Sequence, residues 1–375
     1  MPAMHFVVTP EQEMLRDAAR AYLADKAPPA RVRELMESAD GFDGTLWNGM
    51  AELGWMSMAV PEEYGGVGSS YLELGVLIEE MGRTLVPSPF YSSVVLGASM
   101  LLIAGSEAQR RTYLPDVASG GRRVTVALVE PGGDWSAVAM LATARGAGES
   151  LALSGRKSYV LDGHTADLLV VSARDERNEL NLYLVDAAAN GVSIRQLETM
   201  DLTRRQSEIE LSGVRPLEQL GRDGSAEETV HSLYDIAAVM LAFEQVGGAQ
   251  KCMEMSVAYA KERMQFGRPI GSFQAIKHKC AQMLVDIEAA RSTALYAGWA
   301  LSSGDSDLPV AAALAKVRCS DAYFDVAAET IQVHGGIGFT WEHDAHLYFK
   351  RAKTDQLLFG TPSQWRAKLG DRLGL

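Results

Sequence analysis

One segment of the chain combines a cation, an amide and an aromatic ring at a point where a helix is expected to end. It reads Tyr259-Ala-Lys-Glu-Arg-Met-Gln-Phe-Gly-Arg-Pro-Ile, and the glycine followed closely by proline marks the helix end. Arg263 can fork onto a pyrophosphate, Phe266 offers a flat face to a purine, and Gln265 adds a directional hydrogen bond. Taken alone, the arginine would more simply satisfy carbonyl groups at the helix end. The context of the segment must decide between these interpretations.

Two further segments provide that context. A new helix is expected to begin in Ser272-Phe-Gln274-Ala-Ile, and another ends in Gln332-Val-His-Gly335-Gly336. Paired glycines let a ligand approach the backbone closely. No strand precedes them, so they are not the glycine fingerprint of a dinucleotide-binding βαβ unit.

The elements that must position these residues change in type along the chain. The sequence Thr9-Pro10-Glu11-Gln12 predicts a capped helix start, and more helices are expected near 43–53, 70–84 and 91–118. Short β-branched and apolar runs follow at Arg123–Val129, Ser158–Leu161, Leu168–Ser172, Leu182–Val185 and Ile209–Leu211. Helical periodicity returns over 225–262, 272–302, 307–334 and 342–355. This order predicts an α+β chain with a helical domain at 1–120, a β domain at 121–224 and a helical domain at 225–375.

Composition excludes several classes of function. A formal net charge of -13 disfavours a nucleic-acid partner, and no apolar run approaches the roughly 20 residues that cross a bilayer. The three cysteines are widely spaced, which predicts neither a disulfide framework nor a zinc site. We therefore expect a cytoplasmic protein without a secretion signal, a metal or a membrane partner.

The three segments, in their order and spacing, resemble the C-terminal domain of the acyl-CoA dehydrogenase family. Pro61-Glu-Glu-Tyr-Gly-Gly resembles that family's N-terminal domain, and the resemblance covers essentially the whole chain. It implies a fold with an N-terminal helical domain, a middle β-barrel or sandwich domain and a C-terminal four-helix bundle. It also implies an acyl-CoA substrate, electron-transfer flavoprotein as acceptor, and FAD lying across subunit boundaries. The implied cofactor residues are Arg263, Gln265, Phe266, Gln274, Gln332, Gly335 and Gly336.

The chain departs from the family at both known positions of the catalytic base. The family's Arg-Asp-Ala-Lys-Ile-Tyr-Gln-Ile-Tyr-Glu-Gly-Thr segment aligns without gaps with residues 350–361, which places Phe359 where the glutamate stands. A phenylalanine cannot accept a proton. The alternative position, on the helix that leads to Arg263, is Ala237, and the family's Asp-x-x-Arg on that helix is reduced to Asp235-Ile-Ala-Ala.

The flavin-facing side of the middle domain is altered as well. The family's Thr-Glu-Pro becomes Val129-Glu-Pro, and its Lys-x-Trp-Ile-Thr becomes Lys157-Ser-Tyr-Val-Leu161. Valine and leucine cannot hydrogen-bond a flavin edge. The changes affect the positions that would contact the flavin ring, supply the base and hold the acyl chain. The motifs that would bind adenine are intact. This pattern predicts a subunit that completes the FAD site of a competent homologous chain, as in actinobacterial heteromeric (α2β2) enzymes that oxidise steroid side-chain CoA thioesters.

Two other interpretations remain open. The chain could be a self-sufficient homomeric enzyme that uses Glu244 or Asp235 as its base, although a helical glutamate more often pairs with an arginine. It could also be a structural paralogue without redox chemistry. The segment Trp341-Glu-His343-Asp-Ala-His346 places two histidines on one helix face, but without a third ligand we do not expect a metal there.

Overall fold

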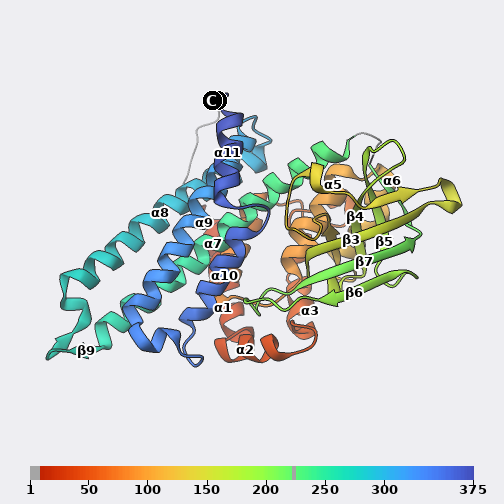
Figure 1. The fold of residues 1–375 in the computed structure, drawn as a ribbon. Coiled ribbons are helices and arrows are strands. Elements are labelled where there is room, and N and C mark those ends of the chain that lie inside the picture. The colour runs from red at the N-terminus through yellow and green to blue at the C-terminus, as the bar shows by residue number, and fades with distance from the viewer. Residues whose placement is uncertain (1–8, 222–224) are drawn as a thin grey trace. The chain divides into compact units, whose positions relative to one another are not determined.

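The computed structural model describes residues 9–221 and 225–375, so the predicted domain boundary at residue 224 lies outside the described residues. The chain divides into two compact units, each assembled from separate stretches of sequence. Among the described residues, one unit holds 9–33, 71–86 and 238–375, and the other holds 34–70, 87–221 and 225–237. The helix–sheet–helix order predicted from the sequence is confirmed (Figure 1).

The unit that contains the C-terminal residues is helical. Its amino-terminal helix α1, Pro10–Lys26, begins with the predicted capping box, in which the Thr9 hydroxyl and the Gln12 side chain satisfy each other's backbone N–H groups at 3.3 and 3.1 Å. Figure 1 shows α8 and α9 lying side by side along most of their length. The helices of this unit are α1, α4 (Tyr71–Thr84), most of α7 (Ala226–Glu262), α8 (Gln274–Ser303), α9 (Leu308–His334), α10 (Ala345–Leu357) and α11 (Pro362–Arg372).

Two glycines let α4 and α7 pack with their backbones in contact. A Cβ atom on Gly82 would lie 2.2 Å from the Glu244 carbonyl oxygen, and one on Gly247 would lie 1.8 Å from the Glu79 carbonyl oxygen. Any larger residue at either position would push the helices apart. This close packing brings acidic residues of α4 beside basic residues of α1 and α8.

The other unit is built on a mixed sheet with the strand order β6-β7-β3-β2-β4-β5-β8, to which β1 adds by pairing in parallel with β4. Its core consists of inward side chains such as Leu153, Val171 and Ile209. The strands are β1 (Val124–Ala127), β2 (Thr143–Arg145), β3 (Ala152–Leu161), β4 (Leu168–Arg174), β5 (Leu180–Asp186), β6 (Val192–Gln196), β7 (Gln206–Val214) and β8 (Glu218–Leu220). The unit also contains α3 (Gly44–Glu52), η3 (Tyr91–Ala98), α5 (Ser99–Ala104) and α6 (Glu107–Ala118).

One sequence expectation was wrong in detail, and several elements were not predicted. The expected helix at 91–118 is interrupted, because the chain is extended at Gly105 and Ser106 begins α6 with a new capping box to Gln109. The helices α2 (Pro29–Glu37) and α11 were not predicted. Neither were the strands β2, β6 and β8, of which β6 alternates between half-buried and exposed residues.

None of the helices in the described ranges is long and apolar enough to cross a membrane.

Candidate functional site

The segment that contains Arg263 forms a two-stranded hairpin directly after α7. The Arg263 N–H donates to the Tyr259 carbonyl at 2.9 Å, so the arginine occupies the helix end as predicted. Strands β9 (Met264–Gln265) and β10 (Arg268–Pro269) pair on either side of a two-residue turn. Both turn residues, Phe266 and Gly267, have positive φ, which is typical of the tightest hairpin turns.

Phe266 is exposed to an unusual degree for an aromatic residue. Its side chain is 92% exposed, and its φ of 52° is a conformation that residues with a side chain rarely adopt. Its ring makes an edge contact with Phe273, 6.0 Å between centroids, and Phe273 immediately precedes Gln274 at the start of α8. The hairpin therefore presents a flat apolar face to solvent or to a ligand.

A second contact joins the hairpin segment to the glycine turn. Tyr259 stacks on His334 with ring centroids 4.5 Å apart and an interplanar angle of 27°. His334 is the last residue of α9, its Nδ1 lies 2.8 Å from the Thr330 carbonyl oxygen, and burial lowers its pKa. The two sequence motifs are therefore neighbours in space.

The glycine turn leaves room for a ligand. Gly335 has φ 63° and ψ -141°, a conformation open essentially to glycine alone. Cβ atoms on Gly335 or Gly336 would meet nothing within 4 Å, and Gln332 is exposed beside them. Arg263, Gln265 and Gln274 are exposed as well.

These residues suit the adenine and pyrophosphate end of FAD. They supply a guanidinium, side-chain amides, an aromatic face and unobstructed backbone within one region of the helical unit. The positions expected to contact the flavin ring offer fewer polar side chains. Val129 and Leu161 are buried, and their carbonyl groups accept hydrogen bonds from Ser158 N–H at 2.8 Å and from Thr125 Oγ1 at 2.7 Å.

The two base positions are occupied by buried groups that cannot take up a proton. Phe359 is 2% exposed, has φ 61°, and its carbonyl accepts a hydrogen bond from Trp365 Nε1 at 2.9 Å. In the other unit, Ala237 is fully buried and its carbonyl accepts a 2.6 Å hydrogen bond from the Tyr91 hydroxyl. Each position is therefore filled by the protein itself.

The two alternative carboxylates are both buried. Glu244 forms an ion pair with Arg351 at 2.6 Å, and the two side chains are 5% and 3% exposed. This is the structural role that the sequence offered as the alternative to catalysis. Asp235 lies on α7 and is 6% exposed. Its role as a base stays a prediction.

The sequence analysis named Lys157 only as the start of an altered motif and missed the structural role of this buried lysine. Lys157 Nζ is fully buried and donates to Leu128 O, Glu130 Oε1 and Ser172 Oγ at 3.1, 2.9 and 3.0 Å. Burial lowers its pKa to about 8. Glu130 also accepts the backbone N–H groups of Leu141 and Ala142, both at 2.6 Å. The lysine thus fixes the Glu-Pro segment to the sheet, a role that a lone Lys in a strand did not reveal.

The histidines that follow α9 face aromatic partners. His343 lies 4.4 Å from His334 between ring centroids, whereas His346 stacks on Trp341 at 5.1 Å. Burial lowers the pKa of both. Within residues 9–221 and 225–375, no group of three or more His, Cys, Asp or Glu side chains could hold a metal ion.

The order of helical, β and helical parts is the architecture of an acyl-CoA dehydrogenase, and comparison with known proteins agrees. Models of the acyl-CoA dehydrogenase N-terminal, middle and C-terminal domains match residues 9–121, 125–214 and 229–373. The chain therefore belongs to the acyl-CoA dehydrogenase family, whose members are oxidoreductases acting on CH–CH bonds.

Three individual proteins match nearly the whole of this chain. The chain is 34% identical to "Acyl-CoA dehydrogenase IpdE2" of Mycobacterium tuberculosis, over 94% of each chain. A structure described as a "Tcur3481-Tcur3483 steroid ACAD" variant matches with TM-score 0.89 and 34% identity, covering 98% of this chain and 99% of that one. The ChsE4-ChsE5 complex from Mycobacterium tuberculosis matches with TM-score 0.90 and 28% identity over 99% of each chain.

Proposed function

We propose that this chain is the base-lacking subunit of a heteromeric (α2β2) acyl-CoA dehydrogenase, in which it completes the FAD site of a competent homologous subunit. The substrate class is a steroid side-chain CoA thioester, the acceptor is electron-transfer flavoprotein, and the location is the cytoplasm. The proposal takes the domains to be 1–120, 121–224 and 225–375.

One contrast carries the proposal. The base positions are closed, because Phe359 is 2% exposed and Ala237 is fully buried. The adenine motifs are open, because Phe266 is 92% exposed and Arg263 and Gln332 are also exposed. A chain that used its own catalytic centre would need an accessible carboxylate at one of the two base positions.

The exposed residues have distinct roles in this proposal. Arg263 forks onto the pyrophosphate of a neighbour's FAD, and Phe266 stacks on its adenine. Gln265, Gln274 and Gln332 supply directional hydrogen bonds, while Gly335 and Gly336 allow the backbone to approach. A bound FAD would supply the acceptor for the hydride removed from the β-carbon of the thioester. The α-proton is taken by a carboxylate of the partner subunit.

The relatives support the partner and the substrate class. The IpdE2 relative is named an acyl-CoA dehydrogenase, one matched structure is described as a steroid acyl-CoA dehydrogenase, and another as a two-component complex. Their resemblance extends over nearly the whole of this chain.

The rival homomeric enzyme finds little support at Glu244. Its carboxylate lies 2.6 Å from the Arg351 guanidinium and is 5% exposed, which is the geometry of a structural ion pair. Asp235 keeps that alternative open, and a structural paralogue without redox chemistry is the third possibility. Expression distinguishes all three.

The decisive experiment expresses the chain alone and together with a homologous chain that carries a carboxylate at one base position. We expect flavin absorbance and acyl-CoA oxidation only in the mixed complex. Arg263→Gln should lower the FAD content of that complex, whereas Arg195→Gln, which alters a surface ion pair with Glu208, should not. Turnover by the chain alone would overturn the proposal, and a mixed complex without flavin would favour the structural paralogue.

A further inference from the structure

The helical unit contains a cavity that lies apart from the residues proposed to hold FAD. Its volume is about 200 Å³, and α1, α4, α7 and α10 all contribute to its lining. Much of the wall is apolar and comes from the end of α1 and the start of α2, including Ala24, Ala27 and Val32, and from Leu347 on α10. Charged side chains complete the wall, among them Arg20, Glu80 and Lys251.

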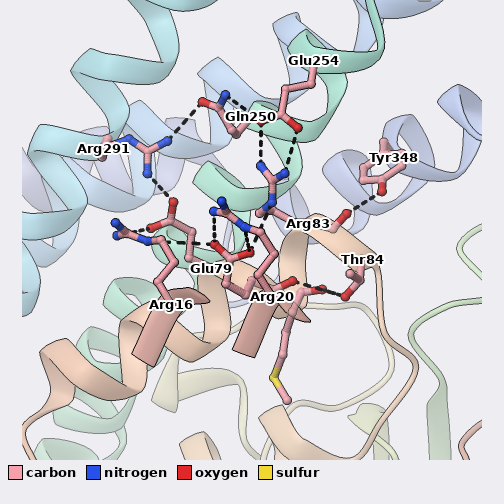
Figure 2. Close-up of polar contacts among 11 residues, drawn as sticks. Arg16, Arg20, Glu79, Arg83, Thr84, Gln250, Glu254, Arg291 and Tyr348 are labelled. Carbon is pink, nitrogen blue, oxygen red and sulfur yellow. Dashed lines mark hydrogen bonds and ion pairs between the residues drawn. The ribbon is translucent and has the colours of Figure 1, made fainter. Parts of the chain in front are cut away.

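The carboxylates of this wall already have cationic partners. Glu80 is 1% exposed and accepts two hydrogen bonds from Arg20, from Nε at 3.0 Å and from Nη2 at 2.7 Å. Arg83 approaches the same carboxylate at 3.3 Å and holds Glu254 through both Nη atoms at 3.0 and 2.8 Å. Figure 2 shows that this network continues through Arg16, Glu79 and Arg291.

The remaining acidic residue of the cavity is paired as well. Asp344 Oδ1 accepts from Arg33 Nε at 3.1 Å and from Arg33 Nη2 at 2.8 Å. No carboxylate of the wall is therefore left to neutralise a further cation.

Lys251 is the cation that remains. It lines the cavity from α7 and makes no ion pair or hydrogen bond with any residue in the part of the chain that the structure describes. Its charge acts on Glu254, three residues further along α7, but both Nη atoms of Arg83 already hold that carboxylate. Arg20 donates to Glu80 through Nε and Nη2, and its Nη1 makes no hydrogen bond to a described residue. The cavity thus offers an ammonium and a spare guanidinium N–H beside an apolar wall.

We propose that this cavity binds a small monocarboxylate, with its carboxylate group facing Lys251 and Arg20 and its hydrocarbon body against the apolar wall. A dry cavity of about 150 Å³ admits benzene, so this one has room for a short aliphatic chain or a single ring. A cationic guest would meet the surplus positive charge. A phosphate dianion would lose its hydration against apolar residues such as Val32 and Leu347.

Binding of hexanoate and benzoate to the purified chain, or to its mixed complex, tests the proposal by calorimetry. We expect saturable binding of both acids, weaker binding of hexanamide and none of hexylamine. Lys251→Met should weaken hexanoate binding about tenfold, because it removes a charge-assisted bond. Lys261→Met, at the exposed end of the same helix, should leave it unchanged.

A second variant tests the shape of the cavity and leaves its charges unchanged. Ala24 lines the cavity but is exposed, so Ala24→Leu should fold normally and narrow the cavity, weakening benzoate binding. Absence of saturable hexanoate binding at millimolar concentration would overturn the proposal, as would equal binding by the Lys251 and Lys261 variants. This readout requires no flavin, so its outcome is independent of the proposed dehydrogenase role.

Discussion

Tyr259 and His334 stack face to face, with ring centroids 4.5 Å apart, and this contact connects the end of α7 to the end of α9. Arg263 follows the tyrosine by one helical turn, and Gly335 follows the histidine directly. The stack therefore sets the distance between the two halves of the proposed adenine site.

Removing this stack should weaken the cofactor without unfolding the chain. An aromatic pair contributes about 0.5–1.5 kcal/mol beyond its buried area, so Tyr259→Ala should weaken FAD binding by the mixed complex about 2- to 10-fold. Tyr296→Ala removes another stacked tyrosine, 5.9 Å from Trp299 on α8, and is the matched control. Equal FAD affinity in the two variants, measured by fluorescence titration, would show that the stack does not position the site.

Acid should lower the stability of the region around the Tyr259–His334 stack. Burial lowers the pKa of His334 and His343 below their ordinary value of 6.5, so the unfolded chain takes up protons that the folded chain resists. Their contribution to stability is complete above pH 6.5 and is lost as the pH falls from there towards the lowered values. We expect the melting temperature to fall over this window.

The variant His343→Asn tests the assignment. His343 Nδ1 accepts the Ala345 N–H at 3.1 Å, and an asparagine oxygen can replace that acceptor without titrating. The fall in melting temperature between pH 7 and pH 5 should therefore become smaller. An unchanged slope in calorimetry would assign the acid sensitivity to other groups.

Restoring the family's glutamate at position 359 should not restore catalysis. The Phe359 side chain is 2% exposed, and an unpaired carboxylate there would cost several kcal/mol in unfolding free energy. We expect Phe359→Glu to lower the melting temperature markedly and to show no acyl-CoA oxidation alone. Phe359→Leu keeps the position apolar and, despite the cavity it leaves, should cost less than Phe359→Glu. A stable, active Phe359→Glu chain would mean that this subunit handles a flavin ring itself.

The buried pair of Glu244 and Arg351 should behave as a structural unit. Arg351→Met leaves the carboxylate buried without its partner and should cost about 3–5 kcal/mol, whereas Glu244→Met with Arg351→Met should cost much less. Denaturant unfolding measures both. If Glu244→Gln abolished turnover of the mixed complex while the fold stayed intact, Glu244 would be catalytic after all.

Lys157 should make the stability of the β-sheet unit depend on pH in the alkaline range. Its pKa is lowered from 10.5 to about 8, so between these values the folded chain binds fewer protons than the unfolded chain. Unfolding free energy should rise by up to about 3 kcal/mol as the pH rises through this window. The melting temperature of the wild type, relative to Lys157→Met, should therefore increase from pH 7.5 to pH 10. A constant difference over this range would indicate that folding does not lower the pKa of the buried lysine.

Sequence reasoning succeeded where a local signal was strong. Thr9-Pro-Glu-Gln predicted α1 correctly, and the same signature at Thr361-Pro-Ser-Gln, which caps α11, could have been used and was not. Strand β6 was missed because an edge strand with half-buried residues has little apolar content. The proximity of Tyr259 to His334 and the paired state of Glu244 depend on packing between distant segments, which no local pattern encodes.

The exposed ring of Phe266 also bears on the lifetime of the protein in the cell. Quality-control chaperones and proteases act on apolar groups that folded chains leave uncovered. A copy of this chain that is synthesised without a ligand or neighbour over the β9–β10 hairpin keeps a ring 92% exposed. The abundance of the chain should therefore depend on the supply of the ligand or neighbouring subunit that covers the hairpin. If a subunit covers it, both subunits must be synthesised in matched amounts for this chain to accumulate.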